Sequence, residues 1–173
     1  MKKWLQNFWY YYKIPVIVVL AVLAAGIYYF LIQRQSVESD YYAAIVSPRE
    51  FSEEQLERIK SVLEGIGKDQ NGDGTAAVQL RVFRFAIGED GQDMNAAAAL
   101  DADLIGKESG LFFTEDPQKF EQSTNGIGKA SEAIPVSGIP LLSGCGIDDL
   151  YLLIRTDAEE KYALLLSALI NYS

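Results

Sequence analysis

The chain lacks histidine altogether and has one cysteine, Cys145, among its 173 residues. Without histidine there is no Ser-His-Asp or Cys-His pair, no imidazole metal ligand and no side chain that ordinarily titrates near neutral pH. A single cysteine also excludes an internal disulfide framework. Because these common catalytic devices are missing, we expect a protein that is not an enzyme.

Basic residues are scarce as well, with 15 Lys+Arg against 24 Asp+Glu and a formal net charge of −9. The imbalance is uneven: residues 1–13 carry three lysines and no acid, whereas residues 33–173 carry 12 basic and 24 acidic side chains. A region this acidic repels the phosphates of nucleic acid, so we predict no nucleic-acid partner. The length and a hydrophobic fraction of 49% fit one folded domain.

Residues 14–32 form a run of 19 residues without a charge, IPVIVVLAVLAAGIYYFLI. As a helix this run is roughly 28 Å long, close to the hydrocarbon thickness of a bilayer. Aromatic side chains flank it on both sides, as in the interfacial belts of membrane helices. Three lysines precede the run and only Arg34 follows closely, so the positive-inside rule places the N-terminus in the cytoplasm and residues 33–173 outside.

A cleaved signal peptide is the alternative interpretation of this segment. Its apolar core is typically about 7–15 residues long and is followed by a small-x-small site, which Ala24-Ala25-Gly26 could supply. The apolar run continues to Ile32, however, and this favours an uncleaved anchor. We therefore divide the chain into a cytoplasmic flank (1–13), a transmembrane helix (14–32), a linker (33–40) and an extracytoplasmic domain (41–173), held in the cell membrane by a single pass.

Strand-like and helix-like segments alternate through the outer domain. A helix is predicted to start at Ser52, because Ser52 and Gln55 form a capping box and Phe51 and Leu56 a hydrophobic staple. An Ala-rich helix is expected over 94–105. Strands are expected at 41–47, 76–85 and 110–114.

The last third of the domain is less regular. Residues 123–146 are rich in Gly, Ser and Pro and read as edge segments or an ordered loop. Residues 150–154 are continuously apolar, which predicts the central strand of the sheet, and Thr156 begins the cap of a final helix over 157–171. The order predicts an α/β fold: a three-layer, mostly parallel sheet with helices on both faces, preceded by one transmembrane helix.

The order of elements over residues 41–115 resembles one lobe of bacterial extracytoplasmic solute-binding proteins. Tyr41-Tyr42-Ala43-Ala44-Ile45 matches the first strand of that lobe, and residues 102–113 match its second helix and third strand. The resemblance implies an extracytoplasmic α/β domain with a solute-binding ancestry. This chain has room for only one lobe, so a two-lobe clamp is excluded and no ligand-binding residue carries over.

Asp69-Gln70-Asn71-Gly72-Asp73-Gly74 matches the front half of a calcium loop. Oxygens of Asp69, Asn71 and Asp73 and the carbonyl of Thr75 could converge on Ca²⁺. The twelfth position of the loop is Leu80, where a bidentate glutamate belongs. A polar helix-to-strand turn is the alternative, because Asn, Asp and Gly favour turns for reasons of their own.

Other chemically capable residues have structural interpretations. Cys145 has no histidine to activate it, so we expect a partly buried small residue. Arg81 and Arg84 could bind an anion, but pairing with nearby acids is the expected role. Three neighbouring acid pairs are expected to be solvated rather than catalytic: Asp101 with Asp103, Asp148 with Asp149, and Glu159 with Glu160.

Three functions remain open at this point. The first is a non-catalytic, membrane-anchored domain with a protein-interaction or accessory role at the bacterial cell envelope, with an envelope protein as partner. The second is a module that binds calcium or a small ligand, related to one solute-binding lobe. The third is an envelope hydrolase that uses carboxylates, which the abundance of acids alone suggests.

Overall fold

The computed structural model describes residues 39–88, 93–158 and 160–171, together with residues 14, 18, 19, 22, 23 and 26. The chain divides into two units, residues 1–38 and 39–173. Within the described part, no helix is both long enough and apolar enough to cross a bilayer, and the predicted span 14–32 lies mostly outside that part. Its six described residues are helical, and their large side chains are 55% to 68% exposed.

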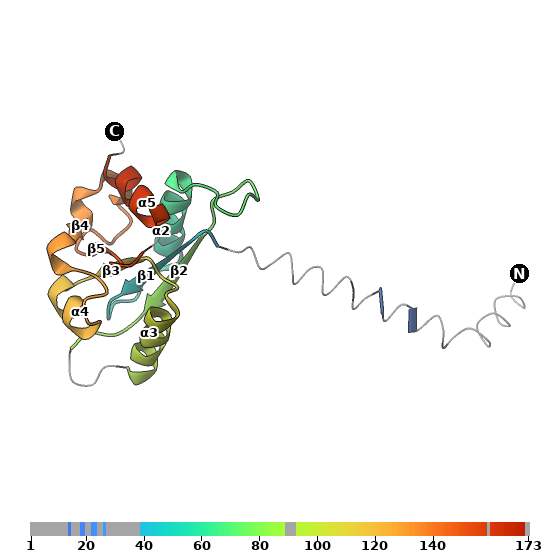
Figure 1. Ribbon diagram of the computed structural model, residues 1–173, viewed down its shortest axis with the longest axis horizontal. Helices are drawn as coiled ribbons and strands as arrows, with labels where there is room; N and C mark the ends of the chain where they lie inside the picture. Colours follow the sequence, from blue (N-terminus) through green and yellow to red (C-terminus); the bar gives the residue numbers. More distant parts are fainter. Residues whose placement is uncertain are drawn as a thin grey trace, which may run out of the picture. The chain divides into compact units, whose positions relative to one another are not determined.

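Residues 39–173 fold around one five-stranded sheet whose order is β2-β1-β3-β5-β4 (Figure 1). The two outer strands of the parallel part, β2 and β3, run parallel to β1, whereas β5 runs antiparallel to both of its neighbours. The strands are β1 (Tyr41–Val46), β2 (Val78–Phe83), β3 (Leu111–Thr114), β4 (Ile134–Pro135) and β5 (Tyr151–Ile154).

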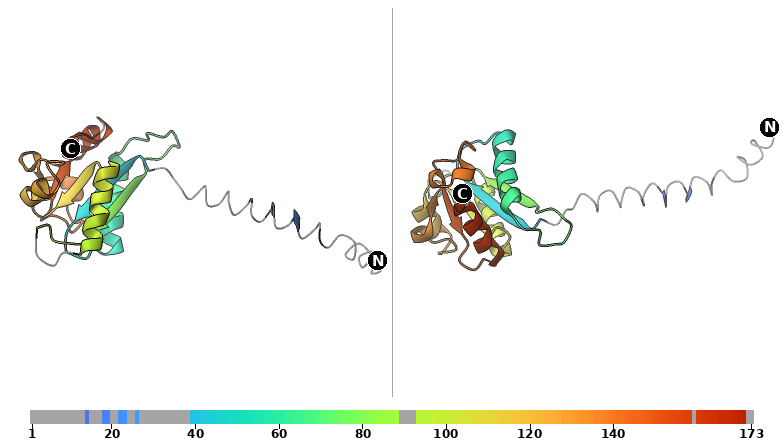
Figure 2. Two further views of the ribbon diagram at one scale, coloured as in Figure 1. Left: turned by 60° about the horizontal axis from the view of Figure 1, so that its bottom comes forward. Right: turned by 90° about the horizontal axis from the view of Figure 1, so that it is seen from above.

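Four helices cover the two faces of this sheet, so the domain has three layers (Figure 2). On one face, odd-numbered residues of β1 and β3 pack against α2 and α5. On the other face, even-numbered residues of the same strands pack against α3 and α4. The helices are α2 (Glu53–Ile66), α3 (Met94–Gly106), α4 (Pro117–Ser123) and α5 (Glu160–Ile170).

The predicted start of α2 is confirmed in detail. The Ser52 hydroxyl accepts a hydrogen bond from the Gln55 N–H at 3.2 Å, and the Gln55 side chain accepts one from the Ser52 N–H at 2.9 Å. Phe51 and Leu56 both pack against the core, as a hydrophobic staple requires. A strong local signal therefore fixed this helix end.

The predicted α/β sheet is confirmed, and its parallel character is partial. The pairings of β1 with β2 and with β3 are parallel, and the two pairings of β5 are antiparallel. The central strand is β3, not residues 150–154, which form the interior strand β5 beside it. Both β3 and β5 are short, apolar and covered on two faces, so their apolar content could not show which of them is the central strand. The Pro-rich segment that follows α4 turns the chain back, so that β5 runs antiparallel to β3.

The final helix also differs from its prediction. It begins at Glu160 rather than at 157. The predicted cap involves residue 159, which lies outside the described residues, and the Thr156 hydroxyl donates to the Gly126 carbonyl at 3.4 Å. Proline confined the irregular stretch to the edge, as expected: Ile134–Pro135 is the two-residue edge strand β4.

Candidate functional site

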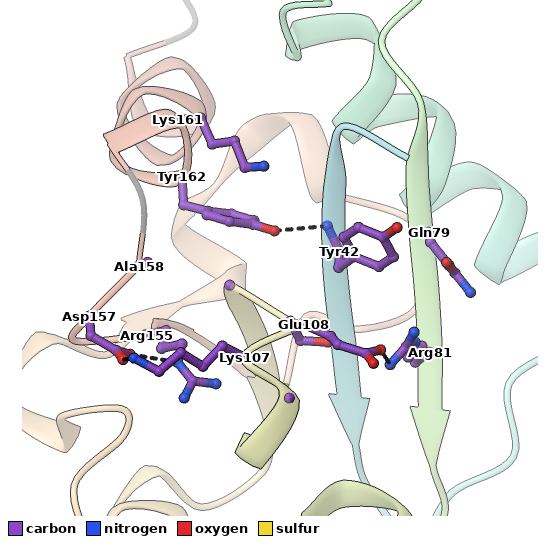
Figure 3. A pocket seen from close by; sticks show the side chains of 13 residues that line it. Tyr42, Gln79, Arg81, Lys107, Glu108, Arg155, Asp157, Ala158, Lys161 and Tyr162 are labelled. Carbon is purple, nitrogen blue, oxygen red and sulfur yellow. Dashed lines mark hydrogen bonds and ion pairs between the residues drawn. The ribbon is translucent and has the colours of Figure 1, made fainter. Parts of the chain in front are cut away.

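A cavity of about 540 Å³ opens on the α3 face of the sheet, where several elements meet (Figure 3). Its floor is at Tyr42 of β1. One wall comes from β2 and the turn between α3 and β3, and the other from the segment between β5 and α5. The volume lies within the range of small-molecule sites. The lining residues are Tyr42, Gln79, Arg81, Gly106, Lys107, Glu108, Ser109, Gly110, Arg155, Asp157, Ala158, Lys161 and Tyr162.

One wall is held by Arg155, which directly follows the buried strand β5 and is only 6% exposed. Its Nε donates to Asp157 Oδ1 at 2.5 Å, and one Nη donates to the Leu104 carbonyl in the last turn of α3 at 2.8 Å. Lys107 Nζ contacts the other carboxylate oxygen of Asp157 at 2.6 Å. Lys107 and Arg155 hold the pKa of Asp157 at about 2, so this carboxylate stays ionised.

The opposite wall is built around Arg81 on β2. Arg81 Nη1 lies 2.6 Å from Asp103 Oδ1 and also contacts Glu108 Oε2. Asp103 is buried in α3 and additionally accepts hydrogen bonds from the N–H and the hydroxyl of Ser109. Burial opposes the charge on Arg81, but Glu108 and Asp103 outweigh it and raise the pKa of the guanidinium. Arg81 is thus fixed in place by two carboxylates.

Tyr162 packs in the core on the α5 face of the sheet and also lines the cavity. It belongs to α5 and packs edge-on against Tyr41, with ring centroids 5.8 Å apart. Its hydroxyl accepts a hydrogen bond from the Tyr42 N–H at 3.1 Å, one residue before the pairing of β1 with β3 begins at Ala43 and Leu111. Gly110 leaves room for the ring: a Cβ there would lie 2.4 Å from ring atoms of Tyr162.

The cavity gathers basic side chains within a domain that has few. Residues 39–173 contain 11 Lys+Arg and 23 Asp+Glu, a balance of −12. Four of those basic residues line the cavity, against two acids, Glu108 and Asp157, which gives the lining a balance of +2. The cavity lining is therefore net positive, whereas the domain as a whole is net negative.

The predicted calcium residues lie together in the exposed loop between α2 and β2. Asp69 accepts hydrogen bonds from the N–H groups of Gly72 (2.6 Å) and Gly74 (2.8 Å), and Asp73 accepts one from the Thr75 N–H at 2.9 Å. The Thr75 N–H and hydroxyl lower the pKa of Asp73. Asn71 lies beside Asp73, with its Oδ1 accepting from the Asp73 N–H at 2.8 Å.

The metal interpretation of this loop stays a prediction. Among the described residues, no group of three or more His, Cys, Asp or Glu side chains is placed to hold a metal ion. The loop is anchored by Asp40, which is buried at the start of β1 and accepts hydrogen bonds from the N–H groups of Gln70, Asn71 and Ala77. The carboxylates of Asp69 and Asp73 accept hydrogen bonds from backbone N–H groups of the loop itself, as in a polar turn.

The remaining predicted residues have structural contacts. Cys145 is buried, beyond the partial burial predicted, and burial raises the pKa of its thiol. Arg84 pairs with Glu50, and Arg81 with two acids, which confirms the expected ion pairs. The expectation that the acid pairs are solvated is wrong for Asp103, which is buried, whereas Asp101 is exposed. Asp148 and Asp149 are both exposed, and Asp149 pairs with Arg49 at 3.0 Å.

Most of the residues that line the cavity were not predicted from the sequence. Lys107 lies 48 residues before Arg155 in the sequence, and it shares no motif with Arg155, Lys161 or Tyr162. One signal was available, because Arg155 follows directly on a continuously apolar strand and a charge there needs partners. No family model, curated protein or solved structure matches this chain.

Proposed function

We propose that this chain is a non-catalytic, membrane-anchored accessory protein of the cell envelope whose outer domain binds a small solute. The observation that carries the proposal is the cavity between Arg81 and Arg155, with its excess of basic side chains in an acidic domain. Concave sites with a few fixed polar groups are the usual places for small ligands. The charged groups of both walls are held by partners, so they are preorganised.

Membrane attachment rests on the uncharged run over 14–32 and on the lysines that precede it. Extracytoplasmic exposure of residues 39–173 follows from the same charge bias. Protease added to cells with a permeabilised outer surface should remove the domain. A protected domain would contradict the orientation, and a soluble mature form would contradict the anchor. An envelope protein partner remains a prediction of the sequence, to be sought by cross-linking in intact membranes.

Ligand binding can be tested with the full chain in phosphatidylcholine nanodiscs. A library of small sugars, carboxylates, amines and ampholytes is screened by thermal shift. At ten times the dissociation constant, a ligand stabilises the native state by about 1.4 kcal/mol. Such a ligand should no longer act on Gln79→Trp, which fills the cavity, and should still act on Gln122→Trp, an exposed position on α4 that lines no cavity described above. A library without a hit, or hits that persist in Gln79→Trp, would refute the proposal.

A calcium-binding role for the loop at 69–75 is the second candidate. The observation in its favour is the loop conformation: Gly72 and Gly74 have φ of 79° and 92°, so the chain makes the sharp turn that brings Asp69, Asn71 and Asp73 together. Without a glutamate at the twelfth position, binding would be weak, with a dissociation constant of about 10⁻⁴ to 10⁻³ M.

A further inference from the structure

The charges around the cavity are not spread evenly but separate onto two sides (Figure 3). One side carries Lys107, Arg155 and Asp157. Both oxygens of the Asp157 carboxylate are engaged, one by Arg155 and one by Lys107. Two positive charges against one negative charge leave this side with a balance of +1.

Lys161 strengthens this positive side. It projects from the start of α5, and its Nζ lies 5.4 Å from the centroid of the Tyr162 ring. It is the third basic side chain on this side, after Lys107 and Arg155. An anionic group in the cavity would therefore be drawn toward this side.

The other side of the cavity has the opposite sign. Arg81 is the one basic side chain among the lining residues there, and it faces two carboxylates, Asp103 behind it and Glu108 beside it. Two negative charges against one positive charge leave a balance of −1. The Glu108 side chain is 46% exposed, and Oε2 is the carboxylate oxygen that contacts Arg81. Glu108 can therefore accept a hydrogen bond from a ligand while it keeps Arg81.

An aromatic surface lies between the two sides. Tyr42 is half-buried in the floor, and the guanidinium carbon of Arg81 lies 5.5 Å from the centroid of its ring. The Tyr42 ring already makes a cation–π contact with Arg81, so it can also stabilise an ammonium group that lies near Glu108. A simple anion would use only the side of Lys161 and Lys107, and would leave Glu108 opposite it as a repulsive group.

We propose that the solute bound in this cavity is a small ampholyte with one carboxylate and one ammonium group. Its carboxylate faces Lys161 and Lys107, and its ammonium group faces Glu108 and the Tyr42 ring. This inference rests on the proposed function, because it requires the cavity to be a binding site. It adds the chemical class of the ligand, which electrostatic complementarity selects.

The test compares ligands that differ only in charge. β-Alanine, γ-aminobutyrate and δ-aminovalerate vary the separation of the two groups. Each is titrated by calorimetry against the full chain in nanodiscs, beside the carboxylate and the amine of the same chain. At least one amino acid of the series should bind about tenfold more tightly than both of its singly charged counterparts, because each lost charged contact removes about a factor of ten.

Substitutions then test which side of the cavity binds the carboxylate and which binds the ammonium group. Glu108→Gln should weaken the binding of that amino acid about tenfold and leave its carboxylate counterpart unchanged, whereas Lys161→Gln should weaken both. Lys129→Gln and Glu132→Gln are matched controls, since this exposed pair (3.0 Å) lies outside the cavity, and should leave all affinities unchanged.

The outcomes separate this inference from the proposed function. A carboxylate that binds as tightly as its amino acid would overturn the ampholyte while leaving a binding cavity. Hits of another class that are lost in Gln79→Trp would do the same. Equal effects of Glu108→Gln on both ligands would overturn the assigned orientation. Only the absence of any hit that depends on the cavity would reject the proposed function itself.

Discussion

Replacing Gly110 by alanine should destabilise the domain through a single contact. A Cβ at this position would lie 2.4 Å from Cε2 and Cζ of Tyr162, well inside van der Waals contact. The neighbouring backbone is tied to two strands, because the Gly110 N–H donates to the Tyr42 carbonyl and the Gly110 carbonyl accepts from the Arg155 N–H, each at 3.0 Å. The tyrosine ring must therefore move rather than the glycine.

The expected magnitude has two parts. Overpacking of a buried ring costs about 1–3 kcal/mol. Displacement of the Tyr162 hydroxyl also leaves the Tyr42 N–H without its acceptor, which adds about 1 kcal/mol or more. We expect the free energy of unfolding to fall by about 2–4 kcal/mol in Gly110→Ala. Tyr162→Phe isolates the second part and should cost about 1 kcal/mol.

Urea unfolding of the full chain in nanodiscs, followed by circular dichroism, measures these differences. Gly106→Ala is the matched control, because a Cβ there meets only the flexible Glu108 side chain, at 3.3 Å or more. A double-mutant cycle with Tyr162→Leu tests the mechanism, since Gly110→Ala should cost little once the ring is gone. A loss below about 0.5 kcal/mol in Gly110→Ala, or a full loss in the Tyr162→Leu background, would refute the reasoning.

Three further predictions concern other parts of the domain. Ser52→Ala removes the cap of α2 and should lower the free energy of unfolding by about 1 kcal/mol in urea titrations, whereas no change would contradict the capping role. The pKa of Asp157 is lowered from 3.8 to about 2, so its stabilising contribution is complete above pH 3.8 and is lost as the pH falls toward 2. The melting temperature of Asp157→Asn should therefore fall less steeply than that of the unsubstituted chain over this interval, and parallel curves would refute the pairing. If the loop binds calcium, about 5 mM Ca²⁺ should raise the melting temperature of the unsubstituted chain but not of Asp73→Ala; an equal shift in both would leave the loop a turn.

The sequence alone determined those elements whose signals are local. The start of α2 was predicted to the residue, because a capping box needs only side chains three positions apart. The class of fold followed from alternating strands and helices, and the edge position of residues 134–135 followed from the missing N–H of proline. Partial burial of Cys145 was predicted from the absence of a histidine to activate it, and the ion pairing of Arg81 from the nearby acids.

Tertiary structure decided what depends on contacts between distant segments. Strand order and direction placed β3 at the centre, since two equally apolar strands compete for that place and only the path of the chain selects one. The cavity exists because β2, the end of α3 and the start of α5 meet at one edge of the sheet. Arg81 and Lys161 are 80 residues apart in sequence, and no periodicity within either segment could reveal that their charges face a common space.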